Sequence, residues 1–288
     1  MKAVYKHELS ACFSGPIGYV FGAGLLLFAG IYCLVYNISG AMPNFEYVLG
    51  GMSFVFLLIV PILTMRVLAE ERRQKTDQLL YSLPLSLTEV VMGKYFAMLT
   101  MFLVPLAIIA LYPLILNAFG SVYLPTAYGA MLGFFLLGAA LIAVGTFISS
   151  LVENPLIAAV ICAVALLLNY FLSSLVDYIP RTGFASMVAF ACVGLILAYL
   201  FRLVTKSDTL ALILGILLEA AVFIPYMLSP GSFTGLFPLV VRNLSLFERF
   251  YVFIGGVFDL TAVVYYLTAI FVMLFLTVQV MEKRRWAE

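Results

Sequence analysis

Long apolar runs, separated by short polar segments, extend along the whole chain. A helix of roughly 20 apolar residues crosses the hydrocarbon core of a bilayer, so each run predicts one membrane-spanning helix. The runs lie at about 17–38, 47–68, 92–117, 126–150, 155–177, 184–204, 208–228 and 259–281. Helix-breaking residues fall between them, namely Pro43, Asn44, Pro125, Asn154, Pro155, Pro180, Ser207 and Asp208. The pattern predicts an all-α integral membrane protein with about eight transmembrane helices.

The sixth and seventh runs are closely spaced, which leaves an alternative of six spans plus a hairpin over 184–228. Basic residues favour eight spans, because cytoplasmic loops carry an excess of Lys and Arg. If the N-terminus is cytoplasmic, that side holds Lys2, Lys6, Arg66, Arg72, Arg73, Lys75, Lys94, Arg202, Lys206, Lys283, Arg284 and Arg285. The external side then holds only Arg181, Arg242 and Arg249, whereas six spans would also move Arg202 and Lys206 outside. We therefore expect both termini in the cytoplasm.

The composition agrees with a membrane protein and excludes some classes of function. The 288 residues are 65% hydrophobic and 10% charged, whereas soluble domains carry about 25% charged residues. The net charge of +1 indicates no basic face for nucleic acid. The cysteines form no CxxC pair, so we interpret them as small apolar residues and not as a disulfide framework or a zinc site. They are Cys12, Cys33, Cys162 and Cys192.

Three segments outside the spans are long enough to have structure of their own, within a single transmembrane domain over 1–288. Residues 2–13 predict an amphipathic helix that lies in the membrane interface. Its apolar side holds Val4, Tyr5, Leu9 and Phe13, and its polar side holds Lys2, Lys6 and Glu8. The second segment is the charged cytoplasmic loop 69–91, and the third is the aromatic external segment 229–258.

The cytoplasmic loop 69–91 carries the densest charge in the chain. Its apolar residues Leu79, Leu80 and Leu83 predict a short helix that Pro84 ends. Ser86 and Glu89 then have the spacing of a capping box, which starts the third span. This order of helix, stop and new helix suits docking to a cytoplasmic partner. The same charges are equally consistent with a loop that only sets the topology.

Three stretches of the sequence resemble the bacterial ABC-2-type transporter permeases. The loop AEERRQKTDQLLYSLPL (69–85), followed by Gly93-Lys94, resembles the first intracellular loop of that family, and HELSACFSGPIGYVF (7–21) resembles its opening helix. The C-terminal stretch 247–286 resembles the gliding-motility (GldF-like) and NosY-like branch. Lys75 departs from the pattern, because many members have Gly there, and this departure leaves the turn before Thr76 open.

The resemblance implies the permease subunit of an ATP-binding cassette transporter that exports its substrate, in the bacterial cytoplasmic membrane. It implies ATPase subunits as partners, a second copy or a related permease, and room for an auxiliary extracytoplasmic protein. The loop would be the coupling helix that contacts the ATPase, supported by helix 2–13. The residues that would make this contact are Glu70, Glu71, Arg72, Arg73, Thr76, Leu79, Leu80 and Pro84.

The sequence has no motif for chemistry on this chain. The pattern GxxxxGK[ST] is absent, so we expect ATP and Mg²⁺ on the partner ATPase and no cofactor here. His7 is the only histidine, which excludes an HExxH metal site, and its place in the predicted interfacial helix 2–13 does not indicate a His-based triad. We therefore expect a non-catalytic subunit.

Two polar residues within the spans are candidates for a transport path. Glu219 lies near the centre of the seventh run, where a carboxyl group is costly and must face protein or water. Asn169 lies in the fifth run. A role in the substrate path and an interhelical hydrogen bond are both open for Glu219. Small residues that predict close helix packing are Gly22, Gly24, Gly133, Gly138 and Gly145.

Two other functions are open at this stage. The chain could anchor or assemble an ATPase and an auxiliary protein without moving a substrate. An ion-coupled secondary transporter ranks last, because such proteins have broken helices and internal repeats, and we find one mid-span acid and no obvious repeat.

Overall fold

The computed structural model describes residues 1–76, 86–176, 178–205 and 207–285, and these residues form helices and connecting turns without a strand. The helices are α1 (Lys2–Ser14), α2 (Pro16–Cys33), η1 (Leu34–Ser39), α3 (Glu46–Met52), η2 (Ser53–Val55), α4 (Phe56–Thr64), α5 (Ala69–Arg73), α7 (Leu87–Ile109), α8 (Tyr112–Phe119), α9 (Leu124–Leu151), α10 (Pro155–Val176), α11 (Gly183–Thr205), α12 (Asp208–Leu228), η3 (Pro230–Phe233), α13 (Leu236–Leu244), α14 (Leu246–Ile254) and α15 (Leu260–Arg285). The all-α prediction is confirmed.

Seven helical runs among the described residues are long and apolar enough to cross a membrane. They are Gly18–Ser39, Glu46–Arg73, Leu87–Phe119, Leu124–Leu151, Pro155–Leu172, Asp208–Leu228 and Leu260–Arg285. The remaining predicted run corresponds to α11, whose apolar part, Gly183–Tyr199, is shorter. The chain is therefore a multi-pass membrane protein, and the boundaries of these helices follow the hydropathy of the sequence closely.

The chain divides into two compact units, Met1–Tyr170 with Arg249–Glu288, and Phe171–Glu248. The predicted external segment 229–258 contributes to both, because α13 belongs to the second unit and most of α14 to the first.

Helix α9 is the centre of the first unit, and it packs against α3, α4, α7 and α15. Three phenylalanines form an aromatic cluster around it. The ring of Phe56 lies 4.5 Å from that of Phe134 and 5.6 Å from that of Phe102, measured between centroids. All three side chains are fully buried, so this cluster fixes how α4, α7 and α9 meet.

Glycines let the neighbouring helices approach α9 closely. A Cβ atom at Gly138 would lie 2.5 Å from the ring of Phe102, one at Gly133 would lie 2.7 Å from Phe253, and one at Gly145 would overlap Thr64. Gly24 likewise faces Ile59. Gly22 has no such contact within the chain, because a Cβ atom there would have no neighbouring atom within 4 Å.

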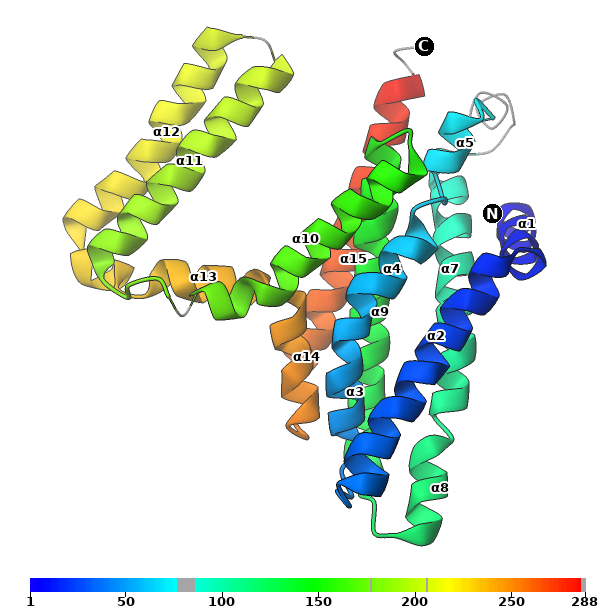
Figure 1. The fold of residues 1–288 in the computed structure, drawn as a ribbon. Helices are drawn as coiled ribbons and strands as arrows, with labels where there is room; N and C mark the ends of the chain where they lie inside the picture. The colour runs from blue at the N-terminus through cyan, green and yellow to red at the C-terminus, as the bar shows by residue number, and fades with distance from the viewer. Residues whose placement is uncertain (77–85, 177, 206, 286–288) are drawn as a thin grey trace. The chain divides into compact units, whose positions relative to one another are not determined.

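Both described ends of the chain lie at the same end of the first unit, beside α5, and α8 lies at the opposite end (Figure 1). Side-chain contacts connect the helices at the end with the termini: Arg284 donates to the Leu151 carbonyl oxygen over 2.9 Å, and Arg72 bonds Glu153 over 2.9 Å. The same end therefore gathers α1, α5 and the last turns of α9 and α15.

The second unit contains the antiparallel pair α11 and α12, with η3 and α13 packed on α11. Small residues four positions apart, Gly194 and Ala198 on α11 and Ala211 and Gly215 on α12, repeat at this interface. A Cβ atom at Gly215 would lie 3.4 Å from that of Ala198. Small residues at this spacing permit close contact between helices in a membrane. These two small-residue motifs were not identified from the sequence.

Candidate functional site

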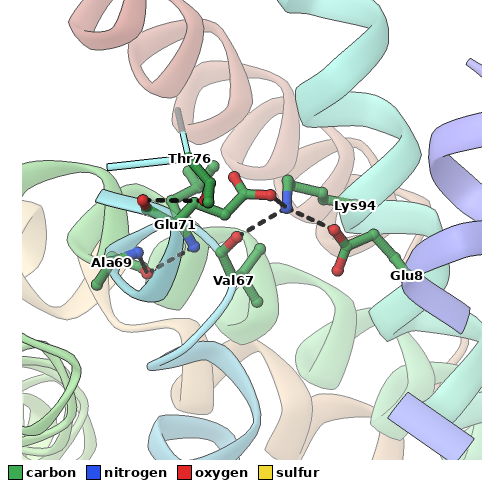
Figure 2. A network of polar contacts seen from close by, with 8 residues as sticks. Glu8, Val67, Ala69, Glu71, Thr76 and Lys94 are labelled. Carbon is green, nitrogen blue, oxygen red and sulfur yellow. Dashed lines mark hydrogen bonds and ion pairs between the residues drawn. The ribbon is translucent and has the colours of Figure 1, made fainter. Parts of the chain in front are cut away.

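A buried lysine, Lys94, lies near the start of α7 and binds two other segments of the chain. Its ammonium nitrogen lies 2.6 Å from Glu8 Oε1 of α1, 2.6 Å from Glu71 Oε1 of α5 and 3.0 Å from the carbonyl oxygen of Val67 (Figure 2). An ammonium group has three N–H donors, so these three acceptors satisfy all of them. Lys94 therefore joins α1, α5 and α7 at one point.

Burial makes this joint sensitive to the loss of any member. The side chain of Lys94 is 2% exposed, and those of Glu8 and Glu71 are 22% and 24% exposed. A buried charge is tolerated when it is paired and fully hydrogen-bonded, and removing one partner is strongly destabilising. The arrangement therefore favours one fixed geometry of the three helices.

The Val67 carbonyl belongs to a break in the second span, where α4 ends at Thr64 and α5 begins at Ala69. Backbone groups that leave the helical ladder inside a membrane need other partners. Lys94 binds the Val67 oxygen, and the hydroxyl of Ser149 on α9 accepts from the Leu68 and Ala69 N–H groups over 3.2 and 3.1 Å. Side chains of α7 and α9 thus satisfy the backbone groups at the break and stabilise it.

The C-terminal end of α5 is followed by a turn that usually contains glycine, although no glycine is present here. Lys75 has φ 56°, the left-handed region. The Thr76 N–H donates to the backbone carbonyl oxygen of Glu71 over 2.9 Å. The Lys75 N–H donates to the backbone carbonyl oxygen of Arg72 over 3.1 Å. These two bonds form the Schellman motif that usually has Gly at this position. The question left open by Lys75 is resolved, because the lysine adopts the conformation that glycine would take.

Helix α1 crosses α7 at Gly93 and Lys94. A Cβ atom at Gly93 would lie 3.1 Å from the Val4 side chain, and Tyr5 Oη lies 3.0 Å from Thr100 Oγ1. The sequence pattern predicts Glu8 on the polar face of α1 with Lys2 and Lys6. This was wrong, because Glu8 turns inward to the buried lysine while Lys2 and Lys6 are exposed.

Comparison with protein families gives one match, to the family described as ABC-2 family transporter protein, over residues 34–180. The matched region includes the break in the second span, the loop after α5 and Lys94. The chain belongs to the ABC-2 transporter family. It is a permease subunit of an ATP-binding cassette transporter, a class that works with ATP-binding cassette ATPases. Comparisons with curated proteins and with solved structures found no match.

The described residues that the sequence predicts to contact an ATPase differ in the bonds that hold them. The Glu70 carboxylate accepts from the Gln74 side chain over 2.8 Å. The Arg72 guanidinium donates to the backbone carbonyl oxygen of Ser150 over 3.3 Å and to the Glu153 carboxylate. The Thr76 hydroxyl donates to the backbone carbonyl oxygen of Glu71 over 3.2 Å. Arg73 is exposed. Leu79, Leu80 and Pro84 lie outside the described residues, as do Leu83 and Asp77.

The predicted cap at the start of the third span of the permease is confirmed, and a second span has a similar cap. Ser86 Oγ accepts from the Glu89 N–H over 3.2 Å at the start of α7. Asp259 Oδ1 accepts from the Thr261 N–H over 2.8 Å at the start of α15. Both caps are local in sequence, which is why a pattern could identify them.

A cavity of about 230 Å³ lies beside the buried lysine, lined by Glu8, Cys12, Arg66 and Lys94 with apolar neighbours. Burial raises the pKa of the Cys12 thiol, and the Glu8 carboxylate adds to this shift while Lys94 opposes it. The thiol is therefore mostly protonated at neutral pH. Among the residues that the structure describes, no cluster of His, Cys, Asp and Glu is arranged to hold a metal ion.

The two transport-path candidates lie in different units of the permease. Asn169 is half-buried on α10 in the first unit, and Glu219 lies on α12 in the second. Glu219 Oε1 is buried without a hydrogen-bond partner among the described residues, beside Gly194 of α11. A Cβ atom at Gly194 would lie 3.1 Å from that oxygen, so this glycine leaves the space that the carboxyl group occupies.

Sequence reasoning missed the central residues of the site, Lys94, Glu8 and Ser149. One signal was available. A lysine eight positions into an apolar helix needs a carboxylate partner, and Glu8 lies on a helix that precedes the same bundle.

Proposed function

We propose that this permease exports a substrate with energy from ATP that separate ATPase subunits hydrolyse, and that segment 69–91 transmits their motion. The observation that carries the proposal is the joint at Lys94. It fixes the start of this segment to α1 and α7, and Ser149 fixes it to α9.

The contacts explain how a displacement of α5 would reach the spans. Short hydrogen bonds to a buried charge resist bending and stretching, so a push on α5 moves its partners instead of being absorbed locally. Lys94 passes the displacement to α1 and α7. Ser149, together with the bonds from Arg72 to Ser150 and Glu153, passes it to α9.

The remaining parts of the proposal follow from the family and from the charge distribution. The permease lies in the bacterial cytoplasmic membrane with both termini inside, because most basic residues gather on that side. It is non-catalytic and holds no cofactor, with ATP and Mg²⁺ on the ATPase. It works with a second copy or a related permease and with an auxiliary extracytoplasmic protein, in the manner of the GldF-like and NosY-like branch that its C-terminal stretch resembles.

Co-purification from native membranes tests the docking surface. Arg73 is suited to this test because it is exposed and makes no structural contact among those described, unlike Arg72. We expect Arg73→Glu to reduce the recovery of the ATPase at least severalfold while the permease stays in the membrane. Lys283→Glu on α15 is the matched control, since it reverses an exposed charge outside the segment. Equal recovery with both variants would contradict a docking role for 69–91.

Reconstitution in lipid vesicles then separates transport from the alternatives. ATP-dependent flux that stops with Arg73→Glu supports the export proposal. ATPase binding without flux would instead indicate an anchoring subunit. Flux that follows an ion gradient and ignores ATP would indicate a secondary transporter.

A further inference from the structure

The cavity of about 230 Å³ beside Lys94 lies entirely within the first unit. Its walls are α1, the end of α4 with the break that follows it, and α7. Sites for drug-sized ligands commonly have about 300–1,000 Å³, so this smaller space suits one polar group of a larger molecule. Charged residues line it together with apolar ones, namely Glu8, Arg66 and Lys94 with Leu63, Ala97 and Met98.

The charged groups that line this cavity are unequally compensated. Lys94 gives its N–H donors to Glu8, Glu71 and the Val67 carbonyl oxygen. Glu8 binds Lys94 through Oε1 and has no other bond to the described residues, so its second oxygen can still accept (Figure 2). Arg66 is exposed, and its guanidinium group has no hydrogen bond or ion pair within the described part of the chain. The cavity therefore offers one unused cation and one carboxylate oxygen.

The surroundings of the cavity are those of a membrane interface. Arg66 lies at the cytoplasmic end of the second span in the proposed topology. Phe13 and Tyr19 lie on either side of the bend at Gly15, which also lines the cavity, and their ring centroids are 6.3 Å apart. These two side chains are 37% and 64% exposed. Exposed aromatic rings gather at the level of lipid headgroups, so a headgroup can reach the cavity while its acyl chains stay in the bilayer.

We propose that the cavity binds the phosphoethanolamine headgroup of a phospholipid, with its phosphate on Arg66 and its primary ammonium on Glu8. Guanidinium groups bind phosphate oxygens through paired N–H donors, and carboxylates accept charge-assisted hydrogen bonds from ammonium groups. A headgroup with a phosphate alone leaves the second Glu8 oxygen without a donor. A quaternary ammonium group also fails there, because it has no N–H.

A headgroup bound in this way connects α1 with the break in the second span. It adds a link between the two elements that Lys94 already joins. The binding requires no ATPase, so the failure of this proposal and the failure of the proposed export function are distinguishable.

Native mass spectrometry of the purified full-length permease in a neutral detergent measures the affinity for added lipids. The probes are phosphatidylethanolamine, phosphatidylcholine and phosphatidylglycerol with the same dioleoyl chains, and soluble O-phosphoethanolamine. The three lipids share the phosphate, but only the first carries a primary ammonium group. We expect phosphatidylethanolamine to bind at least severalfold more tightly than the other two lipids and than the soluble compound.

Arg66→Gln tests the phosphate contact. We expect it to weaken the binding of phosphatidylethanolamine about tenfold, because it removes charge-assisted hydrogen bonds. Arg285→Gln is the matched control, since Arg285 is exposed in the last turn of α15 and does not line the cavity. Arg66→Lys keeps the charge and should retain more binding than Arg66→Gln.

Glu8→Gln tests the ammonium contact. We expect this variant to lose the preference for phosphatidylethanolamine over phosphatidylglycerol, because an amide oxygen binds an ammonium group more weakly than a carboxylate does. Glu8 also belongs to the joint at Lys94. The result is therefore a ratio of two affinities within one protein, which a general loss of folded protein does not change.

The contrary outcomes are equally specific. Equal affinity for the three lipids would indicate only unspecific lipid contact and overturn the proposal, as would equal losses in Arg66→Gln and Arg285→Gln. An unchanged preference in Glu8→Gln would remove the ammonium contact and with it the phosphoethanolamine group. Comparable binding of O-phosphoethanolamine would overturn the assignment to a lipid.

Discussion

Two ionisable side chains lie in helices that are otherwise apolar, and their surroundings differ. Lys94 of α7 is 2% exposed and gives its three N–H donors to Glu8, Glu71 and the Val67 carbonyl. Glu219 of α12 has a buried carboxyl oxygen that no described residue binds. One charge is fully compensated, and the other polar group is not.

The difference separates two uses of a polar group in a membrane. A fully satisfied charge allows one arrangement of its partners, because any displacement breaks a strong bond. It is suited to a rigid joint, as proposed for the coupling segment. An unsatisfied carboxyl group gains free energy from any new partner. It is suited to contact a substrate or a proton during transport.

The largest expected effect comes from removing the lysine. Lys94→Met leaves two carboxylates and the Val67 oxygen without their donor, and we expect it to lower the free energy of unfolding by about 3–5 kcal/mol. Unfolding in mixed micelles that contain SDS measures this change. Lys6→Met, on the exposed face of α1, is the control and should change it by less than about 0.5 kcal/mol.

Adding Glu8→Gln and Glu71→Gln to Lys94→Met should restore part of the lost stability, since no charge then stays uncompensated. If Lys94→Met and Lys6→Met had equal effects, the joint at Lys94 would not be a structural element.

A smaller effect is expected from the close packing around α9. In Gly145→Ala the new methyl group overlaps Thr64, and such overpacking costs about 1–3 kcal/mol. Gly22→Ala is the matched control, because its methyl group meets no atom within 4 Å. The same unfolding measurement applies. A loss of stability in Gly22→Ala that equals that of Gly145→Ala would show that these glycines act through backbone freedom and not through packing.

Glu219→Gln should change stability by less than about 1 kcal/mol, because the buried oxygen has no hydrogen bond to lose. If Glu219 serves transport, the same variant lowers substrate-stimulated ATPase activity of the reconstituted transporter while the ATPase still co-purifies. Unchanged stimulation removes Glu219 from the transport path. A loss of stability as large as that of Lys94→Met would show that Glu219 has a structural partner, and the contrast between the two residues would then fail.

The smallest effect is expected at the turn between α11 and α12. Arg202 Nε lies 2.6 Å from Asp208 Oδ1, but these side chains are 54% and 75% exposed. An exposed ion pair contributes about 0–1 kcal/mol. A double-mutant cycle with Arg202→Gln and Asp208→Asn should therefore give a coupling energy below about 1 kcal/mol. A larger value would show that this pair holds the two helices together and that the small-residue interface is secondary.

Local features of the molecule were predictable from neighbouring residues. The apolar runs locate the spans within a few residues, because bilayer thickness sets their length. Ser86 was identified as a cap because a cap and its N–H donor lie only two or three residues apart. Position 75, where many members of the resembling family have Gly, is the residue that has positive φ.

The partners of Lys94 were not predictable in the same way. Glu8 precedes it by 86 residues and Val67 by 27. Hydropathy assigned Glu8 to the polar face of α1. Hydropathy describes the preference of a side chain for water, and it does not identify the residue that the side chain will contact. The glycines show the same limit. Their small size predicts close packing. Only the arrangement of helices shows that a Cβ atom at Gly145 would overlap Thr64, and that one at Gly22 would have no neighbouring atom within 4 Å.

The helical, multi-pass character of this protein and the position of its charged segment could be predicted from the sequence, because these properties depend on the apolar character of each stretch. The positions of the helices in space were needed to show that α5 is joined to α1, α7 and α9, and that Gly145 lies against Thr64. Hydrogen bonds and ion pairs act over a few ångströms in space, and the distance along the chain does not report that separation.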